Sequence, residues 1–444
     1  MARGAEGRTD SKTLQGDAVF TSRRRHSTWT QSKHLEFLTV VSTSPSKPPF
    51  IIQPPGRGAL VKEMAAIGVS ESGIRIMGPK GNALAIKVPD LKAPQASILK
   101  QQMLSLGGDA AQSKNVLTDS TARTDVLLLG SEAHFRRLVD ALGRQQFRLS
   151  SLALQIEELL TNWRVEPSLF LAREKKLNLA GRTAIMGILN VTPDSFSDGG
   201  RFLDTKSAVE RALQMQEQGA DIIDVGAEST RPGAAPITID EELQRLLPVL
   251  RAVVTELRAI VSVDTYKSPV AEAALDCGAD MINDVSGLTF DRNLAQAVAR
   301  YRAGLAVMHI QGTPRSMQAA PHYDDLLGEV HFSLSQSCSK ALSAGIGRQS
   351  IAVDPGIGFG KTPEHNLRLI NYLGTLRGLG MPILLGTSRK SFIGKVLDKP
   401  VEQRMHGTAA SVALAIARGA SIVRVHDVLE MREVCDVVDA IVGS

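Results

Sequence analysis

Polar and charged side chains follow eight short apolar runs between residues 184 and 425 of this 444-residue sequence. Their types are those that bind ligands or carry charge, namely carboxylates, amides, guanidinium groups, amines and imidazoles. A single Asp or Asn after a strand is as readily a helix cap as a ligand, but eight such ends in succession indicate a shared site. In chain order the ends carry Asn190; residues 228–233; Asp264 and Thr265; Asn283 and Asp284; Met308, His309 and residues 311–315; residues 354–361; residues 388–391; and residues 424–427.

Two chemical subsets separate among these side chains. Asp264, Asn283 and Asp354 combine carboxylates with an amide, which suits the donor and acceptor edges of a nitrogen heterocycle. The second subset offers donors for a phosphate or pyrophosphate and an oxygen ligand for Mg2+. It comprises Asn190, Arg231, Lys390, Arg424 and His426. The sequence therefore predicts that a heterocycle and an anionic leaving group bind together, and it offers no nucleophile–base arrangement for covalent acyl transfer.

One stretch imitates a different kind of site. Residues 356–362 read Gly-Ile-Gly-Phe-Gly-Lys-Thr and resemble the end of a phosphate-binding P-loop. The first position of that eight-residue motif falls on Pro355, where glycine is required, so we reject an NTPase function. Scattered histidines show no ligand spacing, and we expect packing or surface roles for them. They are His134, His322, His331, His365 and His406.

The apolar runs that precede these side chains have the length and composition of buried parallel strands. They are rich in Val, Ile and Leu and cover residues 184–189, 222–225, 259–263, 281–282, 305–308, 351–353, 383–385 and 422–425. Segments of helical periodicity lie between them. Eight strand–helix units in a region of this size predict an α/β fold of the (β/α)8 TIM barrel type, with a doubly wound sheet as the alternative. In a barrel the strand ends share one face, so the polar side chains would converge on one pocket.

Two helix starts are signalled within this region. Thr238 with Glu241 has the spacing of a capping box. Ser268 before Pro269 predicts an N-cap followed by proline at the first helical position. Pro248 lies inside a helical pattern, where we expect a kink.

The sequence upstream divides into two parts. Residues 1–56 are rich in Pro, Ser and Arg and predict a disordered linker. Residues 57–170 mix helical and strand patterns and predict a small α+β extension domain before a barrel at 177–444. The expected elements are helices at 60–67, 96–105 and 131–142 and strands at 73–77 and 124–129.

Composition limits the class of protein. The aromatic share of 4% and the net charge of +5 argue against a nucleic-acid surface built on stacked rings. Three widely spaced cysteines form neither a zinc motif nor a disulfide framework, so we expect a reducing, cytoplasmic environment. No apolar run is long enough to predict a membrane span.

Taken together, these motifs resemble those of the dihydropteroate synthases of the folate pathway. The resemblance covers residues 177–444 and rests on the order of residues 187–200, 228–233, 262–265, 282–285, 308–314, 354–361, 388–391 and 424–427. It implies a (β/α)8 barrel, in agreement with the count of apolar runs. It also implies a transferase that joins 6-hydroxymethyl-7,8-dihydropterin pyrophosphate to 4-aminobenzoate, commonly as a homodimer.

The resemblance also implies roles for individual residues. A pterin would lie among Asp264, Asn283, Val285, Met308, Asp354, Gly386 and Lys390. Pyrophosphate would be held by Asn190, Arg231, Arg424 and His426, with Mg2+ on Asn190. The ring of 4-aminobenzoate would be enclosed by Phe196, Thr230, Pro232, Phe359, Lys390 and Ser391.

In the family's reaction the C–O bond to pyrophosphate breaks first, and the amine then attacks the pterin-methyl cation. The resemblance implies that Asp198, on a closing loop, stabilises this cation while arginine, imidazole and Mg2+ stabilise the leaving group. We expect the loop at 192–200 to close only on bound ligands. The extension lies outside the catalytic core of the family, and we expect it to be dispensable for chemistry.

Two other functions compete with this interpretation. A pterin-binding methyltransferase that serves a corrinoid protein would share contacts of the Asp264, Asn283 and Asp354 type. It has no use for the two loops at 190–200 and 229–233 or for Arg424 with His426. A scaffold or nucleic-acid role for the basic N-terminus would leave the polar strand ends without a purpose, and salt-dependent RNA binding by residues 1–60 would support it.

Overall fold

The computed structural model describes residue 52 and residues 57–145, 149–191, 201–230 and 233–444. Four residues with predicted roles lie outside the described residues, namely Phe196, Asp198, Arg231 and Pro232. The expected loop closure at 192–200 and the expected disorder of residues 1–51 and 53–56 also fall on positions that are not described.

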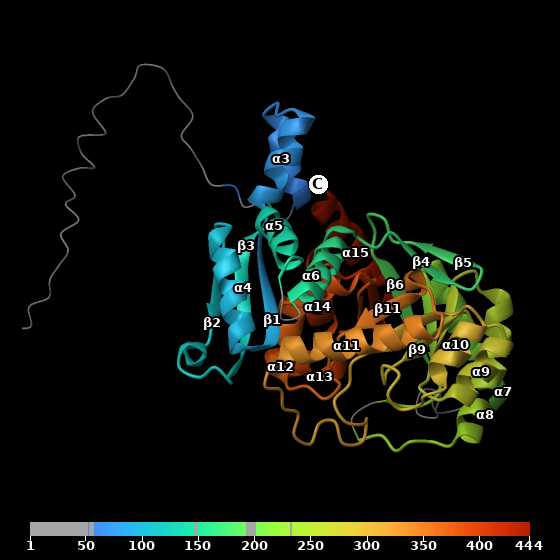
Figure 1. Cartoon of the computed structure of the whole chain (residues 1–444). Helices are drawn as coiled ribbons and strands as arrows, with labels where there is room; N and C mark the ends of the chain where they lie inside the picture. The colour runs from blue at the N-terminus through green and yellow to red at the C-terminus, as the bar shows by residue number, and fades with distance from the viewer. Residues whose placement is uncertain (1–51, 53–56, 146–148, 192–200, 231–232) are drawn as a thin grey trace, which may run out of the picture. The chain divides into compact units, whose positions relative to one another are not determined.

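Eight parallel strands form a closed barrel (Figure 1). They are β6 (Ala184–Asn190), β7 (Ile222–Gly226), β8 (Ile260–Asp264), β9 (Met281–Asp284), β10 (Gly304–Met308), β11 (Ile351–Asp354), β12 (Leu384–Leu385) and β13 (Ile422–Val425). Their order is β11-β10-β9-β8-β7-β6-β13-β12, and a parallel bridge between Val353 and Ile383 joins the two ends. The predicted barrel is therefore confirmed.

Alternation along each strand divides the core into two layers. In β6, Ala184 and Met186 belong to the apolar cluster inside the barrel, whereas Ile185 packs in the cluster that also contains the helices. The helices are α7 (Arg201–Glu217), α8 (Ile239–Glu256), α9 (Ser268–Asp276), α10 (Leu294–Arg300), α11 (Leu326–Ser343), α12 (Pro363–Asn371), α13 (Ser391–Leu397), α14 (Met405–Ala417) and α15 (Val428–Gly443). Short 3-10 turns are η3 (Arg348–Ser350), η4 (Leu373–Leu379) and η5 (Val401–Gln403).

One of the two predicted helix starts is confirmed and the other is wrong by one residue. Thr238 caps α8 and accepts a hydrogen bond from the Glu241 amide at 3.2 Å. In α9 the N-cap is Lys267, and Ser268 is the first helical residue. The reason is tertiary, because the Ser268 amide donates to the Asp291 carboxylate at 2.8 Å and a distant side chain thus takes over the cap.

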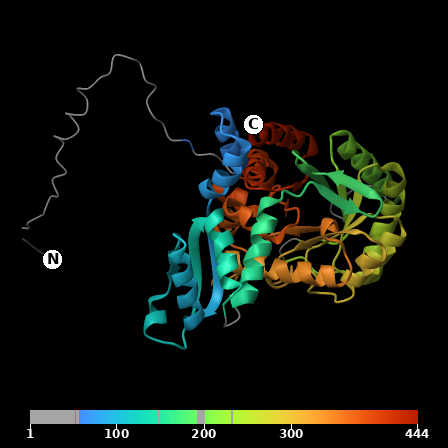
Figure 2. The same ribbon diagram turned by 45° about the horizontal axis from the view of Figure 1, so that its top comes forward.

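A hairpin before the barrel covers the end at which the strands begin (Figure 2). Its strands, β4 (Leu169–Ala172) and β5 (Lys175–Asn178), pair antiparallel. Phe170 is completely buried with the inward residues of the barrel strands. The Phe170 ring lies so close to Gly304 that a β-carbon there would come within 2.9 Å of it. The hairpin therefore fills one end of the barrel with apolar side chains.

The extension before the barrel has a hydrophobic core of its own. Its antiparallel sheet, in the order β1-β3-β2, consists of β1 (Ala83–Lys92), β2 (Asp109–Gln112) and β3 (Arg123–Ser131). Its helices are α2 (Arg57–Ala66), α3 (Glu71–Gly81), α4 (Ala93–Ser105), η1 (Lys114–Leu117), α5 (Glu132–Leu142) and α6 (Leu149–Arg164). The predicted strand at 73–77 is wrong, because it lies inside α3. Ser70 starts that helix by accepting a hydrogen bond from the Gly73 amide at 3.2 Å.

Helix α6 connects the extension to the barrel through η4. Asn162 donates a hydrogen bond to the Gly378 carbonyl at 3.0 Å. The Arg377 guanidinium lies 5.4 Å from the centre of the Trp163 ring. Residues Gly56–Ser444 accordingly form one compact unit. That the extension is dispensable for chemistry stays a prediction.

We expect Phe170→Ala to lower the free energy of unfolding by about 3–5 kcal/mol, because it leaves a cavity in the closed end of the barrel. Urea denaturation measures this loss. The control is Phe332→Ala, whose side chain is 63% exposed and whose removal should change stability by less than about 0.5 kcal/mol. Equal stabilities of the two variants would show that the hairpin does not contribute to the barrel core.

Candidate active site

Strand register brings three of the predicted residues to one level. Asn190 of β6 pairs with Gly226 of β7, Gly226 with Asp264 of β8, and Asp264 with Asn283 of β9. On the opposite side of the barrel, Met308 of β10 pairs with Asp354 of β11. The carboxyl ends of these strands therefore form one rim, as expected for a parallel barrel.

A partly buried guanidinium connects the two predicted chemical subsets. Arg424 of β13 donates from Nε to Asp224 at 2.7 Å and from Nη2 to Asp264 at 3.1 Å. Asp224 is fully buried and also accepts from Asn283 at 3.0 Å and from Ser262 at 2.7 Å. The orientation of Arg424 is thus set by two carboxylates before any ligand binds.

Asp264 has one oxygen that is not used within the described part of the chain. Its Oδ2 accepts from Arg424, whereas its Oδ1 is buried without a hydrogen-bond partner there. Burial raises the pKa of Asp264 to about 7, with Asp224 adding to the rise and Arg424 opposing it. A buried acceptor without a donor is costly, so this oxygen is a candidate contact for a ligand N–H group.

Lys390 and Asp354 form a second charged pair of groups at the rim. Burial lowers the pKa of Lys390 to about 8, and the Asp354 carboxylate opposes that shift. Burial likewise raises the pKa of Asp354, whose Oδ1 accepts from the Gly356 amide at 2.7 Å. Lys390 Nζ donates to the Ile357 carbonyl and lies 4.8 Å from the centre of the Phe359 ring. The amine therefore lies between a carboxylate and an aromatic face.

His426 lies two residues after Arg424, at the end of β13. Its backbone amide donates to Ser388 Oγ at 3.2 Å, and the same oxygen lies 2.9 Å from His426 Nδ1. A hydroxyl that accepts from the amide is placed to donate its own proton to Nδ1. This arrangement favours the tautomer with a proton on Nε2, which makes the imidazole a donor.

The remaining predicted residues differ in how closely they join this arrangement. Val285 is buried after β9, and a β-carbon on Gly386 would lie 3.8 Å from Lys390 Nζ. Thr230 and Ser391 form no hydrogen bond with the network among the described residues. Asp284 has a structural role, because it accepts from the amides of Ser286 and Leu288 and so shapes the turn after β9.

Sequence reasoning missed the role of Asp224. Its signal was present, because a carboxylate inside an apolar strand must have partners. The sequence could not show that Arg424, two hundred residues later, is the main one.

Lys361 also has a role that the motif alone did not reveal. It is 2% exposed and lies 2.8 Å from His309 Nδ1, and it donates to the Phe359 carbonyl at 2.9 Å. Burial, reinforced by the Lys361 charge, lowers the pKa of His309 to about 3. Lys361 thus connects the loops that follow β10 and β11.

Carboxylate and amide acceptors lie beside guanidinium, amine and imidazole donors at this rim. Such a site can orient a polar heterocycle and stabilise negative charge on a departing group. Within the described ranges, no group of three His, Cys, Asp or Glu side chains is placed to hold a metal ion. Nor is any helix in those ranges long and apolar enough to cross a bilayer.

Comparison with known proteins gives consistent matches. The family model described as pterin binding enzyme matches residues 186–426. The dihydropteroate synthase of Synechocystis sp. is 48% identical over 261 residues, which is 59% of this chain and 90% of that protein. The solved structure of Xanthomonas albilineans dihydropteroate synthase in complex with 7,8-dihydropteroate is 39% identical. It aligns with a TM-score of 0.55 and covers 62% of this chain and 98% of that one.

One further match reaches into the extension. A Haloferax volcanii protein named "Probable bifunctional folylpolyglutamate synthase/dihydropteroate synthase" is 41% identical over 350 residues, covering 76% of this chain and 41% of that protein. This stretch is longer than residues 177–444, so it includes part of the sequence before the barrel.

We expect Asp224→Ala to lower the free energy of unfolding by about 3–5 kcal/mol, because it removes one partner of a buried ion pair. Asp436→Ala is the control, since this carboxylate pairs with Arg432 but is 66% exposed and should contribute less than about 1 kcal/mol. Chemical denaturation of both variants compares them. A cost for Asp224→Ala no larger than that of the control would contradict the proposed support of Arg424.

Proposed function

Because the chain belongs to the pterin binding enzyme family, and within it to the dihydropteroate synthases, we propose that it condenses 6-hydroxymethyl-7,8-dihydropterin pyrophosphate with 4-aminobenzoate. The products are 7,8-dihydropteroate and pyrophosphate. The observation that carries the proposal is the buried, unpartnered Oδ1 of Asp264 beside Asn283 and Arg424. An acceptor of this kind suits a heterocycle with several N–H groups.

The pterin is bound mainly by the hydrogen-bond acceptors of the rim. Asp264 accepts ring N–H groups, Asn283 offers an amide that both donates and accepts, and Asp354 accepts on the far side of the barrel. Lys390 donates to a ring acceptor, since its pKa of about 8 leaves it mostly protonated at pH 7. Val285, Met308 and Gly386 supply the apolar and close-packed surface around the ring.

The pyrophosphate is bound by the guanidinium and imidazole donors of the rim. Among the described residues, Arg424 keeps Nη1 available while Nε and Nη2 bind carboxylates, and His426 donates from Nε2. Arg231, outside the described residues, adds a second guanidinium. Fixed donors of this kind stabilise the charge that grows on the leaving group, which is where electrostatic catalysis is most effective.

Mg2+ fits the oxygen ligands at the rim when the substrate is present. The ion prefers a few protein oxygens together with substrate phosphate oxygens and water. Asn190, at the end of β6, offers an amide oxygen at the level of Asp264 and Asn283. Bound there, Mg2+ would neutralise charge on the departing pyrophosphate.

The amine substrate lies against Phe359, Lys390, Ser391 and Thr230, with Phe196 and Pro232 from the loops outside the described residues. The C–O bond of the pterin pyrophosphate breaks first, and its electron pair leaves with pyrophosphate. Asp198 stabilises the resulting pterin-methyl cation. The amine nitrogen then forms a bond to the methylene carbon and releases its proton, so that positioning and electrostatics supply most of the catalysis. The homodimer and the cytoplasmic location stay predictions.

The direct test is to incubate the full chain with the pterin pyrophosphate, Mg2+ and 4-aminobenzoate and to measure pyrophosphate release. We expect release that depends on the amine and that accompanies formation of dihydropteroate. Release without any requirement for the amine, or no release at all, would overturn the proposed function.

In that assay Arg424→Ala should lower kcat/KM by about 10²-fold or more, because a preorganised donor to the leaving group is lost. Arg424→Lys keeps the charge that Asp224 and Asp264 require but lacks the planar fork, so it should also lose most of the activity. Thermal unfolding confirms that each variant is folded. Unchanged kinetics of a folded Arg424→Lys would contradict the assignment.

Asp264 should make pterin binding depend on pH. Its pKa is raised to about 7, so the carboxylate form that accepts N–H groups becomes populated as pH rises through that value. Pterin affinity measured by calorimetry should therefore increase from pH 6 to pH 7, a range in which Lys390, with its pKa of about 8, stays mostly protonated. Asp264→Asn should bind more weakly and lose this pH dependence, because an amide also donates. The exposed Asp398→Asn is the control and should behave like the unaltered chain.

A further inference from the structure

A cavity lies at the end of the barrel opposite the active site. Its volume is about 500 Å3, within the range of small-molecule sites. Its lining comes from β5 and from the residues that precede β6, β7 and β8. In a parallel barrel these positions lie at the amino ends of the strands, so the cavity is separate from the rim that carries Arg424.

The acceptor groups of this cavity are already in use. Gln216 Oε1 accepts from the amides of Arg258 and Ala259 at 2.6 and 2.9 Å. Asn178 Oδ1 accepts from the Ala180 amide at 3.0 Å. In each side chain the NH2 group is therefore left as a donor. Within the described residues, neither NH2 group has a hydrogen-bond partner.

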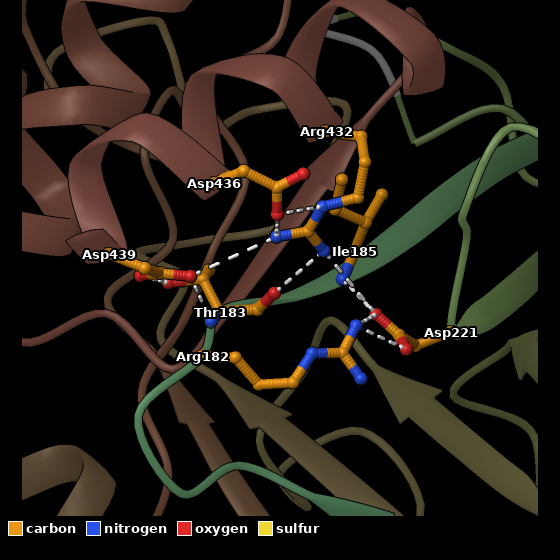
Figure 3. Close-up of polar contacts among 7 residues, drawn as sticks. All are labelled: Arg182, Thr183, Ile185, Asp221, Arg432, Asp436 and Asp439. Carbon is orange, nitrogen blue, oxygen red and sulfur yellow. Dashed lines mark hydrogen bonds and ion pairs between the residues drawn. The ribbon is translucent and has the colours of Figure 1, made fainter.

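The carboxylate in the lining is neutralised. Asp221 accepts from Arg182 Nη2 with both oxygens, at 2.8 and 3.0 Å, and from the Ile185 amide at 2.9 Å (Figure 3). Arg432 of α15 lies 3.9 Å from the same carboxylate. Arg182 contacts Asp221 through Nη2, so within the described residues its other N–H groups stay available as donors.

Cationic groups dominate the rest of the lining. Lys175 pairs with Asp280 at 2.8 Å and donates to the Ala259 carbonyl at 2.6 Å. Lys176 and the Arg258 guanidinium are exposed and have no ion pair among the described residues. The lining thus holds four cationic side chains against one carboxylate, and it has donors to offer but no unused carboxylate.

We propose that this cavity binds a small, multiply charged phosphate ester or polyphosphate. A phosphoryl group has only acceptor oxygens, and it matches guanidinium, ammonium and amide donors converging from several strand ends. The volume leaves room for a compact organic group beside the phosphate. This binding is independent of the synthase reaction, because none of the cavity residues belongs to the active site.

The test is calorimetric titration of the full chain with tripolyphosphate, which should also occupy the active site and so give two binding events. The double variant Lys176→Ala/Arg258→Ala should weaken one event by about tenfold or more and leave amine-dependent pyrophosphate release unchanged. The control Arg75→Ala/Lys80→Ala removes two exposed charges from α3. It should leave both events intact.

Three outcomes would overturn the proposal. The first is equal binding by the Lys176→Ala/Arg258→Ala variant and the unaltered chain. The second is equal loss in the α3 control, which would indicate nonspecific attraction between charges. The third is citrate binding as tightly as tripolyphosphate, which would exclude a preference for phosphate. Because synthase activity is measured separately, failure here is distinguishable from failure of the proposed function.

Discussion

Closure of eight parallel strands is the constraint on which the rest of this molecule depends. Parallel pairing places every strand end on one rim, and closure brings β11 next to β12 through the bridge between Val353 and Ile383. Residues more than two hundred positions apart, such as Ala184 and Ile422, thereby become neighbours. Arg424 of β13 reaches Asp224 of β7 and Asp264 of β8 across the intervening strand β6.

Burial of charge is the second feature that unites the site. Asp224, Asp264 and Asp354 are all withdrawn from water, which is unfavourable for a carboxylate unless cations or donors compensate. Arg424 and Lys390 provide that compensation. Burial nevertheless displaces the pKa values of Asp264 and Lys390 toward neutrality. Such groups respond strongly to a charged ligand because little solvent screens them.

The two ends of the barrel differ in how they are packed. At the carboxyl ends, loops of glycine-rich backbone pack closely, and a β-carbon on Gly356 would meet the His309 carbonyl at 1.9 Å. Lys361 connects the same two loops through its contacts with His309 and the Phe359 carbonyl. At the amino ends, the β4–β5 hairpin fills the barrel with Phe170, and the ion pairs of Asp221 and Arg432 connect α15 to β6 and β7 (Figure 3). Apolar packing thus closes the amino end of the barrel, whereas the carboxyl end carries the buried charged groups.

The sequence by itself determined the order and the approximate bounds of all eight barrel strands, because each is a short apolar run followed by polar residues. It also located most rim residues, since the end of a parallel strand is where the side chains of a site must emerge. Local signals failed where a distant group decided the outcome. The cap of α9 shifted because Asp291 reaches Ser268, and residues 73–77 became helical once Ser70 capped α3.

Only the tertiary structure decided which rim groups pair with one another. Asp224 lies inside an apolar run and looked like part of a strand, yet it supports Arg424 from two hundred residues away. The free oxygen of Asp264 and the donor-rich cavity at the other end are likewise invisible in a linear pattern. The physical reason is that hydrophobic periodicity is local, whereas hydrogen-bond satisfaction is settled by whatever the closed barrel brings within about 3 Å.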